Sequence, residues 1–475
     1  MRKKFLIIFC LMVLAGCSNT KPKEPEERLA TLAGREYLEK YGKTISLDEA
    51  VEIAKERNLD LKVKSLEREI SSLDRKIAFG NFLPSINVMG GYTKLDDNID
   101  LDVDTSSLSN AFPPHISGLL GKVGVTIPTS MNSRFVDKSF YSFGVSAQIP
   151  VFVPSTWYLY SARKKGEKIS GLVEEFAEKM LELQVMGEYY YILALQSERA
   201  ALENELKSAR ELENKVKISL KVEAVLPWEY EKAQAFVKIK EYALNENKRD
   251  LKNAKMRFMR TLNLNPLEEI ELEDEIIFPE EIPSMEDCIY SAVSGNEILK
   301  IAETGKDITN DMKKIAVTNF LPKIILGGGY INNSNEILSD PDFLYGNVTG
   351  VLSIFNGFKN INEYKKAVRR EKIGELKLEK EFMTVVVETA KAYRNLEKAQ
   401  EMREIANLNF KGEKGRLHQK RAERKVDMIG DEEYFRAISS YEVAFAMKKK
   451  ADFQYAMALG SLKIAMGKYP FKEGK

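Results

Sequence analysis

The first residue whose type and position indicate a chemical reaction is Cys17. Basic residues 2–4 precede an apolar run, Phe5 to Leu14, that is too short to cross a bilayer as a helix. The run leads into Leu14-Ala15-Gly16-Cys17. Small side chains before a cysteine are what a lipoprotein signal peptidase requires, and the Cys17 thiol would then carry diacylglycerol. The alternative is an ordinary signal peptide followed by an unrelated cysteine.

This reading makes residues 1–16 a signal peptide and residues 17–45 a lipid-anchored tether with an N-terminal segment. More than one acyl chain on Cys17 would give stable membrane anchoring. Ser18, rather than an aspartate, follows the cysteine, which indicates the outer rather than the inner membrane. After the signal no apolar stretch reaches about 18 residues, so the sequence predicts no transmembrane helix.

Other reactive side chains give no catalytic or metal pattern. Cys288 has no cysteine partner in the mature chain, and His115 and His418 lie far apart in sequence without ligand-like neighbours. There is no P-loop and no Gly-x-Ser-x-Gly motif, so we expect neither an enzyme nor a cofactor. A net charge of +1 excludes a strongly basic nucleic-acid binder.

The segments that would position any functional site occur twice in the sequence. The segment from Asn81 to Tyr92 returns 238 positions later, from Asn319 to Tyr330, with eight of twelve residues identical. The same offset relates Ser46 to Ser284 and Asn58 to Asn296. A repeat of this length indicates two copies of one large unit, residues 46–262 and 284–467, joined by linker 263–283 and followed by tail 468–475.

Each copy is predicted to begin with a helix of about 36 residues, from Ser46 or Ser284 to Phe82 or Phe320. Pro84 and Pro322 stop these helices. Strands follow at 85–94 and 323–332, and a second strand closes each hairpin, 85–152 and 323–355. After the hairpin the offset between copies becomes 203, so Tyr190 matches Tyr393 and Leu264 matches Gly467.

The returning strands alternate in polarity with period two over about eleven residues, which is the length of a tilted membrane strand. The predicted lipid-facing set is Tyr141, Phe143, Val145, Ala147, Ile149, Leu344, Val348 and Leu352. The predicted lumen-facing set is Ser142, Ser146, Gln148, Asn347 and Thr349. A soluble hairpin with one buried face is the alternative.

The first hairpin loop is longer than the second by 35 residues, an insertion within 95–140. It would lie outside a membrane. Its acids could bind a divalent cation or simply be solvated; they are Asp96, Asp97, Asp100, Asp102 and Asp104.

Very long helices follow each hairpin. We expect helices over 156–224 and 228–262 in the first copy, and over 358–427 and 431–466 in the second. Each long helix equals the short helix and the return helix together, so two short helices would lie end to end beside one long helix of ~100 Å. Four strands are too few for a membrane barrel, and an open sheet edge in lipid is not viable. The chain must therefore oligomerise if the strands enter a membrane.

The chain resembles the TolC family of outer-membrane factors, in its lipoprotein branch, over essentially all of its mature length. The resemblance rests on the duplicated Asn-Phe-Leu-Pro…Gly-Gly-Tyr, the lipobox, the tyrosines at 190 and 393, and Ile354-Phe355-Asn356-Gly357. Phe358 departs from the family pattern by replacing a second glycine, and Phe152-Val153-Pro154-Ser155 departs in the first copy.

The resemblance implies a homotrimer with a 12-stranded outer-membrane β-barrel and an α-barrel tunnel, hence a mixed, mainly α fold. It implies a passive exit duct for efflux or type I secretion, with a periplasmic adaptor and an inner-membrane pump as partners. The substrate, and whether the pump is driven by protons or ATP, stays open. A periplasmic coiled-coil adaptor or tether is the competing hypothesis.

The resemblance also implies a periplasmic gate and two adaptor-docking tips. The gate residues would be Asp427, Asp431, Glu432, Glu433 and Arg436, with Glu433 near the family's first gate acid and Arg436 where a second acid often lies. Repeated in a trimer, unpaired acids would favour cations and oppose closure; ordinary solvated charges at a helix start are the alternative. The docking tips would use Glu223, Val225, Leu226 and Pro227, and Met428, Ile429 and Gly430.

Overall fold

The computed structural model describes residues 44–104, 130–273, 281–334 and 342–470, with a few isolated positions between 104 and 130. The chain divides into two compact units. The first unit is Met1–Leu66, Leu172–Lys300 and Glu381–Lys475, and the second is Glu67–Gly171 and Ile301–Lys380. Cys17 and His115 lie outside the described residues.

The short helix of each copy is two helices, which corrects the single helix expected from the sequence. In the first copy α4 (Leu47–Arg57) is followed by α5 (Leu59–Gly80), and in the second α10 (Met285–Gly295) is followed by α11 (Glu297–Thr318). Asn58 and Asn296 separate them with ψ near +128°, outside the helical region. Ser46 forms the predicted capping box with Glu49 at the start of α4.

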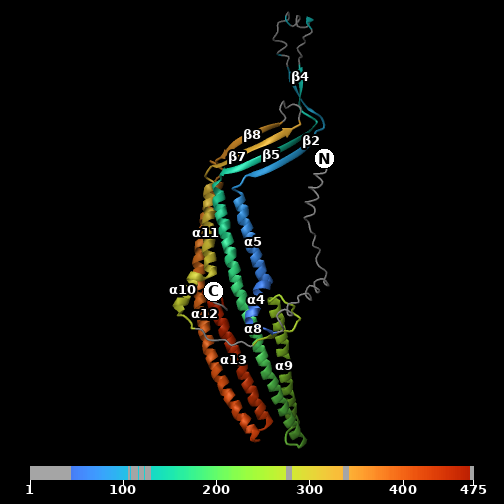
Figure 1. Cartoon of the computed structure of the whole chain (residues 1–475), viewed down its shortest axis with the longest axis vertical. Helices are drawn as coiled ribbons and strands as arrows, with labels where there is room; N and C mark the ends of the chain where they lie inside the picture. Colours follow the sequence, from blue (N-terminus) through green and yellow to red (C-terminus); the bar gives the residue numbers. More distant parts are fainter. Residues whose placement is uncertain are drawn as a thin grey trace. The chain divides into compact units, whose positions relative to one another are not determined.

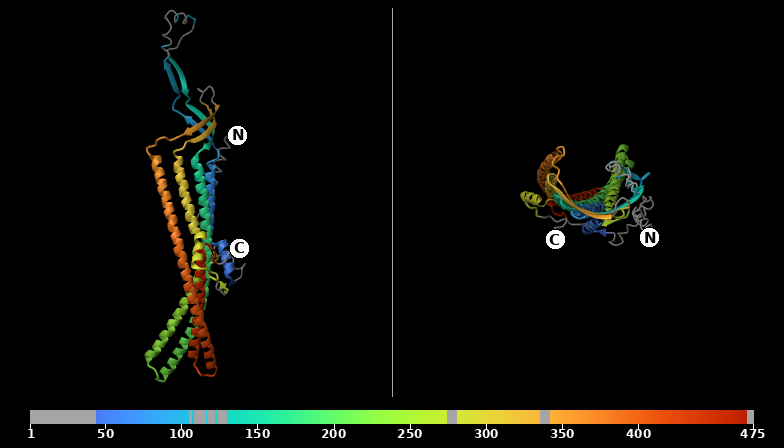
Figure 2. Two further views of the ribbon diagram at one scale, coloured as in Figure 1. Left: turned by 90° about the vertical axis from the view of Figure 1, so that its left-hand side faces the viewer. Right: turned by 90° about the horizontal axis from the view of Figure 1, so that it is seen from above.

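The second unit contains a four-stranded antiparallel sheet in the order β2-β5-β7-β8 (Figure 1). The strands are β2 (Ser85–Lys94), β5 (Ser139–Phe152), β7 (Lys323–Asn333) and β8 (Asp342–Val351). All four expected strands are therefore present. The hairpins of the two copies pair through β5 and β7, and the sheet is curved when seen from above (Figure 2).

The long first loop contains a strand pair that the sequence did not predict. β3 (Ile99–Asp104) pairs antiparallel with β4 (Ser130–Val136). Asp100, Asp102 and Asp104 alternate along β3, so they share one face of this ribbon. No group of metal ligands is found among the described residues, these acids included.

Four helices of the second unit lie in the same order as the strands. Arg75 of α5 bonds Glu167 of α8 (Pro154–Lys221) at 2.5 Å. Lys165 of α8 bonds Asp311 of α11 at 2.7 Å. Lys313 of α11 bonds Glu371 of α12 (Lys359–Lys425) at 2.6 Å. These contacts give the order α5-α8-α11-α12, which matches the strands that each helix adjoins in sequence.

The first unit holds the two helical hairpins and their hydrophobic clusters. α9 (Pro227–Thr261) returns beside α8, and α13 (Asp431–Ala465) returns beside α12 (Figures 1 and 2). Tyr189, Phe258 and residues of α4 form the larger cluster. Cys288, Leu396 and Tyr455 belong to the other.

A short parallel pair, absent from the sequence prediction, lies beside the larger cluster. β1 (Thr44–Ile45) pairs with β6 (Glu271–Leu272). The buried hydroxyl of Tyr189 bonds the carbonyl oxygens of Ile45 and Glu273, at 3.1 and 2.7 Å, and so joins the two segments.

The return helices show that equivalent positions in this region differ by 204 residues, not 203. α9 and α13 each have 35 residues, and their starts and ends are both 204 apart. Left-handed residues follow both helices, at Asn263 (φ 53°) and Gly467 (φ 77°). Asn263, rather than Leu264, therefore matches Gly467, and by the same offset Tyr189 rather than Tyr190 matches Tyr393.

Candidate functional sites on the sheet and at the helical tips

The strand registers place the predicted lipid-facing residues of β5 and β8 on one face of the sheet. Val145 pairs with Tyr330, and Tyr330 pairs with Leu344. Directly paired residues share a face, as do residues two positions apart. This links Tyr141, Phe143, Val145, Ala147 and Ile149 to Leu344 and Val348. Leu352 lies one residue beyond the end of β8.

The apolar face also contains residues of the two strands for which the sequence analysis made no assignment. Ile86, Val88 and Tyr92 of β2 pair with Ala147, Val145 and Tyr141. Leu326 and Tyr330 of β7 pair with Val348 and Leu344. Most of its large side chains are exposed. Alternation in β2 between Ile86, Asn87 and Val88 was the signal that could have identified them.

The predicted lumen-facing residues share the opposite face. Ser146 pairs with Asn87 and Gly329, and Gly327 pairs with Asn347. Ser142, Gln148 and Thr349 lie on this face by the same two-residue alternation. The face is mixed rather than polar, because Met89, Ile331, Phe343 and Tyr345 also belong to it.

Glycines on this face make room for larger side chains of β8. A β-carbon on Gly327 would collide with the side-chain oxygen of Asn347. A β-carbon on Gly329 would lie 2.5 Å from the backbone oxygen of Val145 and 3.1 Å from the Tyr345 ring. The repeated glycines therefore provide space for Asn347 and Tyr345, in addition to marking the duplication.

The helix-to-strand junctions lie where the sequence placed them. α5 ends at Gly80 and α11 at Thr318, and a turn of backbone bonds continues each to Leu83 or Leu321. Pro84 and Pro322 come next and directly precede β2 and β7. The turn, rather than the proline itself, ends each helix.

The departure from the family pattern at Phe358 has a backbone consequence. Gly357 and Phe358 precede α12 with φ values of 65° and 63°. The left-handed region favours glycine, and a bulky residue there is uncommon. The Phe358 ring packs edge-on against Phe355 at 5.3 Å between centroids.

The two hairpin tips have the same backbone conformation. Glu223 (φ 57°) and Asp427 (φ 56°) occupy equivalent left-handed positions just after α8 and α12. The next amides, of Ala224 and Met428, bond the carbonyls of Ser219 and Glu423 at 2.9 Å, as in a Schellman motif. Pro227 is the first residue of α9 and Gly430 the N-cap of α13.

Only some of the apolar residues of the predicted docking tips are exposed. Leu226 and Met428 are exposed, whereas Val225 and Ile429, which are equivalent, are half-buried. Val222 and Val426, which the sequence analysis did not select, are exposed at equivalent positions. Their 204-residue spacing becomes recognisable only once the helix ends are known.

The predicted gate acids whose side chains are described all lie against basic groups of the same chain. Asp427 is 2.8 Å from Arg424, and Glu433 is 2.7 Å from Lys420. Glu432 is 2.7 Å from Arg436 and 3.1 Å from Lys215 of the other hairpin. The side chain of Asp431 lies outside the described part. Arg436 thus pairs with one of the predicted gate acids.

A buried ion cluster lies where the two helix breaks meet the C-terminal segment, and the sequence analysis missed it. The Lys179 ammonium contacts Glu297 at 2.6 Å, Glu175 at 2.9 Å and the carbonyl of Gly467 at 2.8 Å. Lys179 and Glu297 are buried. Burial would lower the pKa of Lys179, but Glu297 and Glu175 outweigh it, so the pKa is raised.

Lys55 and Tyr469 extend this cluster. Lys55 pairs with Glu182 and, at 2.9 Å, with Glu178. The Tyr469 hydroxyl donates to Glu178 at 3.3 Å. Burial, reinforced by the nearby carboxylates of Glu178 and Glu175, raises the pKa of Tyr469 to about 12.

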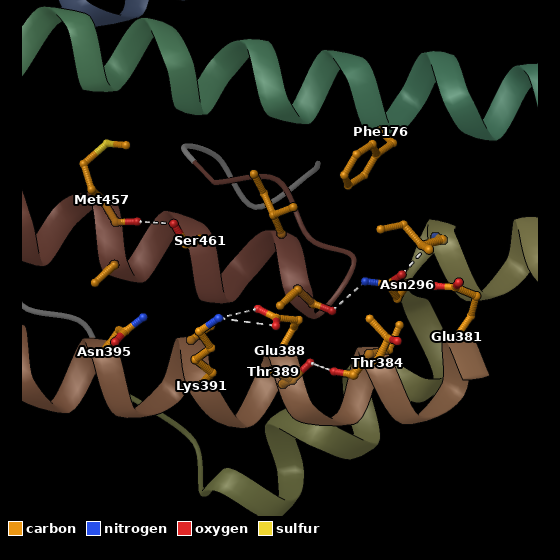
Figure 3. A pocket seen from close by; sticks show the side chains of 16 residues that line it. Phe176, Asn296, Glu381, Thr384, Glu388, Thr389, Lys391, Asn395, Met457 and Ser461 are labelled. Atoms are coloured by element: carbon orange, nitrogen blue, oxygen red, sulfur yellow. Dashed lines mark hydrogen bonds and ion pairs between the residues drawn. The ribbon is translucent and has the colours of Figure 1, made fainter. Parts of the chain in front are cut away.

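A hollow of about 580 Å³ in the first unit is lined by residues of α8, α11, α12 and α13 (Figure 3). Several of its polar groups bond within one helix: Thr389 bonds the Val385 carbonyl, Ser461 bonds the Met457 carbonyl, and Lys391 pairs with Glu388. In the part of the chain that the structure describes, none of the helices has the length and apolar character that a membrane crossing requires.

Neither a protein-family model nor a curated protein matches the sequence. Solved structures do match. The CmeC outer membrane channel of Campylobacter jejuni has a TM-score of 0.69 at 16% identity, covering 89% of this chain and 85% of that chain. The open MtrE outer membrane channel of Neisseria gonorrhoeae has 0.66 at 18% identity, covering 89% and 88%. The outer membrane protein VceC of Vibrio cholerae has 0.65 at 12% identity, covering 89% and 96%. The chain has the fold of these proteins.

Proposed function

We propose that this chain is one third of a passive outer-membrane exit duct, opened at its helical tips by a periplasmic adaptor and an inner-membrane pump. It would act as a channel, not as an enzyme. One observation carries the proposal. The four strands and four helices of the second unit lie in the same order, and both layers end in elements with one side uncovered. The fold shared with outer membrane channels supports the same conclusion.

The sheet edges call for further copies of the chain. In the described part of the chain, β2 and β8 each pair with one strand only. Unpaired backbone groups are not viable in lipid, and closure of a barrel removes them. Placing β8 of one copy beside β2 of the next would close a sheet of twelve strands from three copies.

The edge helices support the same arrangement. Along α5, six apolar side chains recur every four and three residues, and each is at least half exposed: Leu59, Val63, Leu66, Ile70, Leu73 and Ile77. This is the spacing of a coiled-coil seam. α12 likewise exposes Ile373, Leu376, Met383 and Val387. The α5 seam of one copy would therefore pack against α12 of its neighbour.

The two sheet faces fit the outside and inside of such a barrel. The face that contains Phe143, Val145 and Leu344 would contact lipid, and the face that contains Ser146 and Asn347 would line the pore. A lipid-facing band of apolar and aromatic side chains is typical of membrane barrels.

Assembly can be tested with adjacent substitutions on α5. Ile70→Lys places a charge in the exposed seam, whereas Glu69→Lys places the same side chain one position away. We expect Ile70→Lys to prevent trimer formation, measured by analytical ultracentrifugation in detergent, and Glu69→Lys to leave it intact. A wild-type protein that stays monomeric and conducts no ions in planar bilayers would overturn the proposal and favour the adaptor hypothesis.

The gate would be held closed at the tips by an ion pair between the two hairpins. Lys215 of α8 and Glu432 of α13 form an ion pair between them, whereas Asp427 and Arg424 lie within one turn. Separation of the hairpins would break the first pair and leave the second intact. We expect Glu432→Gln to raise single-channel conductance and Asp427→Asn to change it much less. Equal effects would contradict this gate.

Lipid anchoring at Cys17 belongs to the same proposal and rests on the sequence alone. Cells grown with radioactive palmitate should label the wild-type protein but not Cys17→Ser. Label that persists in the variant would contradict the assignment.

A further inference from the structure

We propose that the constriction at the helical tips favours anions, so that this duct passes negatively charged small solutes in preference to cations. The inference rests on the proposed function, because it assumes a pore that is narrowest at the tips. It reverses the selectivity that unpaired gate acids would give.

The charges at the tips are the first argument. The segment from Lys411 to Arg436 contains eight lysines and arginines and six acids. The equivalent segment of the first hairpin, from Lys207 to Lys232, contains six and five. The tips therefore carry a net +3 per chain, although the whole chain is only +1. Three copies would repeat this excess around one axis.

The geometry of the second hairpin is the next argument. A hollow of about 410 Å³ at its tip is lined by four basic side chains and two acids. The basic residues are Lys215, Arg416, Lys420 and Arg436, and the acids are Glu432 and Glu433. The basic groups come from three helices, α8, α12 and α13, so the positive charge surrounds the hollow rather than following one helix face.

Around Glu432, exposure strengthens the effect of the basic charges on a passing ion. The Glu432 side chain is 21% exposed, whereas its two partners, Lys215 and Arg436, are 50% and 66% exposed. The two cationic side chains are therefore more accessible to solvent than the carboxylate between them. Asp427 and Glu433 are exceptions, since their side chains are 88% and 53% exposed, more than those of their partners Arg424 and Lys420, which lie 2.8 and 2.7 Å away.

A narrow, low-dielectric passage concentrates the field of such charges. Rings of arginine or lysine side chains select anions in other pores, as acidic rings select cations. Charges lining a cleft also raise the local concentration of oppositely charged solutes. The net positive tip would therefore concentrate anions where the passage is narrowest.

The test is the reversal potential of single channels in planar bilayers across a potassium chloride gradient. We expect chloride to be preferred by the wild type. Arg416→Glu combined with Lys420→Glu should move the reversal potential toward the potassium value. Lys248→Glu with Lys252→Glu is the matched control, because it makes the same charge change with the same spacing on an exposed part of α9.

The outcomes separate this inference from the proposed function. A conducting channel that prefers potassium, or one whose reversal potential responds equally to both double variants, would overturn the anion preference and leave the duct intact. A protein without conductance would overturn both. Lys215→Gln, a milder change at the same hollow, should give a smaller shift in the same direction, so a folding defect in the double variant would not decide the result.

Discussion

The side-chain amide of Asn58 donates a 2.9 Å hydrogen bond to the backbone carbonyl of Thr261, at the end of the return helix. Its carbonyl oxygen accepts from the Leu61 amide at 3.0 Å and so caps α5. Asn296 repeats both roles, with Ala465 as acceptor at 2.9 Å and the amides of Ile298 and Leu299 as donors. In both copies, therefore, an asparagine interrupts the helix, and the hydrogen bonds of its side chain hold the interruption in place.

Removing this side chain should destabilise the protein in two separable parts. Asn58→Ala loses the cap and the bond to Thr261, about 2 kcal/mol together. Asn58→Ser keeps a capping oxygen and should lose about half as much. The measurement is the urea midpoint by circular dichroism at fixed protein concentration. Asn253→Ala, on an exposed part of α9, is the control, and an equal shift there would contradict the role of Asn58.

The Lys179–Glu297 pair should tolerate loss of both partners better than loss of one. Lys179→Met leaves the Glu297 carboxylate buried without its main counter-charge, at a cost of about 3–5 kcal/mol. Adding Glu297→Leu should recover most of the urea midpoint. Arg199→Met breaks an exposed pair with Glu203 and should cost less than about 1 kcal/mol. A double variant no more stable than Lys179→Met would contradict the explanation.

Alkaline pH should weaken the cluster around Tyr469. The pKa of Tyr469 is about 12 in the folded protein against 10 for an ordinary tyrosine, so the folded state holds this proton more tightly. Its contribution is complete below pH 10 and is lost as the pH rises toward 12. Tyr469→Phe should therefore gain stability relative to wild type over this interval, on the order of 1–2 kcal/mol, in urea unfolding. A constant difference between pH 9 and pH 12 would exclude the raised pKa.

Local sequence patterns predicted much of the fold, but they did not predict the details that depend on contacts between residues far apart in the sequence. Proline and glycine punctuation placed α9 and α13 within one residue at each end, and period-two alternation assigned the faces of β5 and β8. The breaks at Asn58 and Asn296 were missed, because asparagine also occurs inside helices. What fixes each break is a carbonyl 203 or 169 positions away.

The candidate tip site shows the same limit. The acids at 432 and 433 could be found from the sequence, but not what neutralises them. Lys215 lies 217 positions before Glu432, and Lys179 lies 118 positions before Glu297. Ion pairing over such separations depends on how the hairpins pack, and the sequence pattern alone does not show how they pack.

The space above Gly329 should be essential to the sheet. Gly329→Ala would place a methyl group 2.5 Å from the backbone oxygen of Val145, which cannot move without breaking the β5–β7 pairing. Gly346→Ala, in the adjacent strand, meets nothing closer than 4.0 Å and serves as the control. We expect the first variant, but not the second, to fail to form the proposed trimer, measured by analytical ultracentrifugation in detergent. Equal recovery of both would contradict the packing argument.

Glycine should be better than phenylalanine for the backbone at position 358. Phe358→Gly removes left-handed strain but also the ring contact with Phe355, whereas Phe358→Ala removes only the contact. The glycine variant should therefore be more stable than the alanine variant by about 0.5–1 kcal/mol. Hydrogen exchange of the first amides of α12 measures the difference locally. Faster exchange in the glycine variant would be the opposite result.

The open edges of β2 and β8 have a consequence for inheritance. In a ring of three copies, each chain supplies one edge to each neighbour, so one chain with a blocked edge leaves the whole ring unclosed. A cell that makes intact and blocked chains in equal amounts would complete only about one ring in eight. A substitution confined to an edge strand would then behave as a dominant trait, and its severity would depend on gene dosage rather than on the stability of the altered chain.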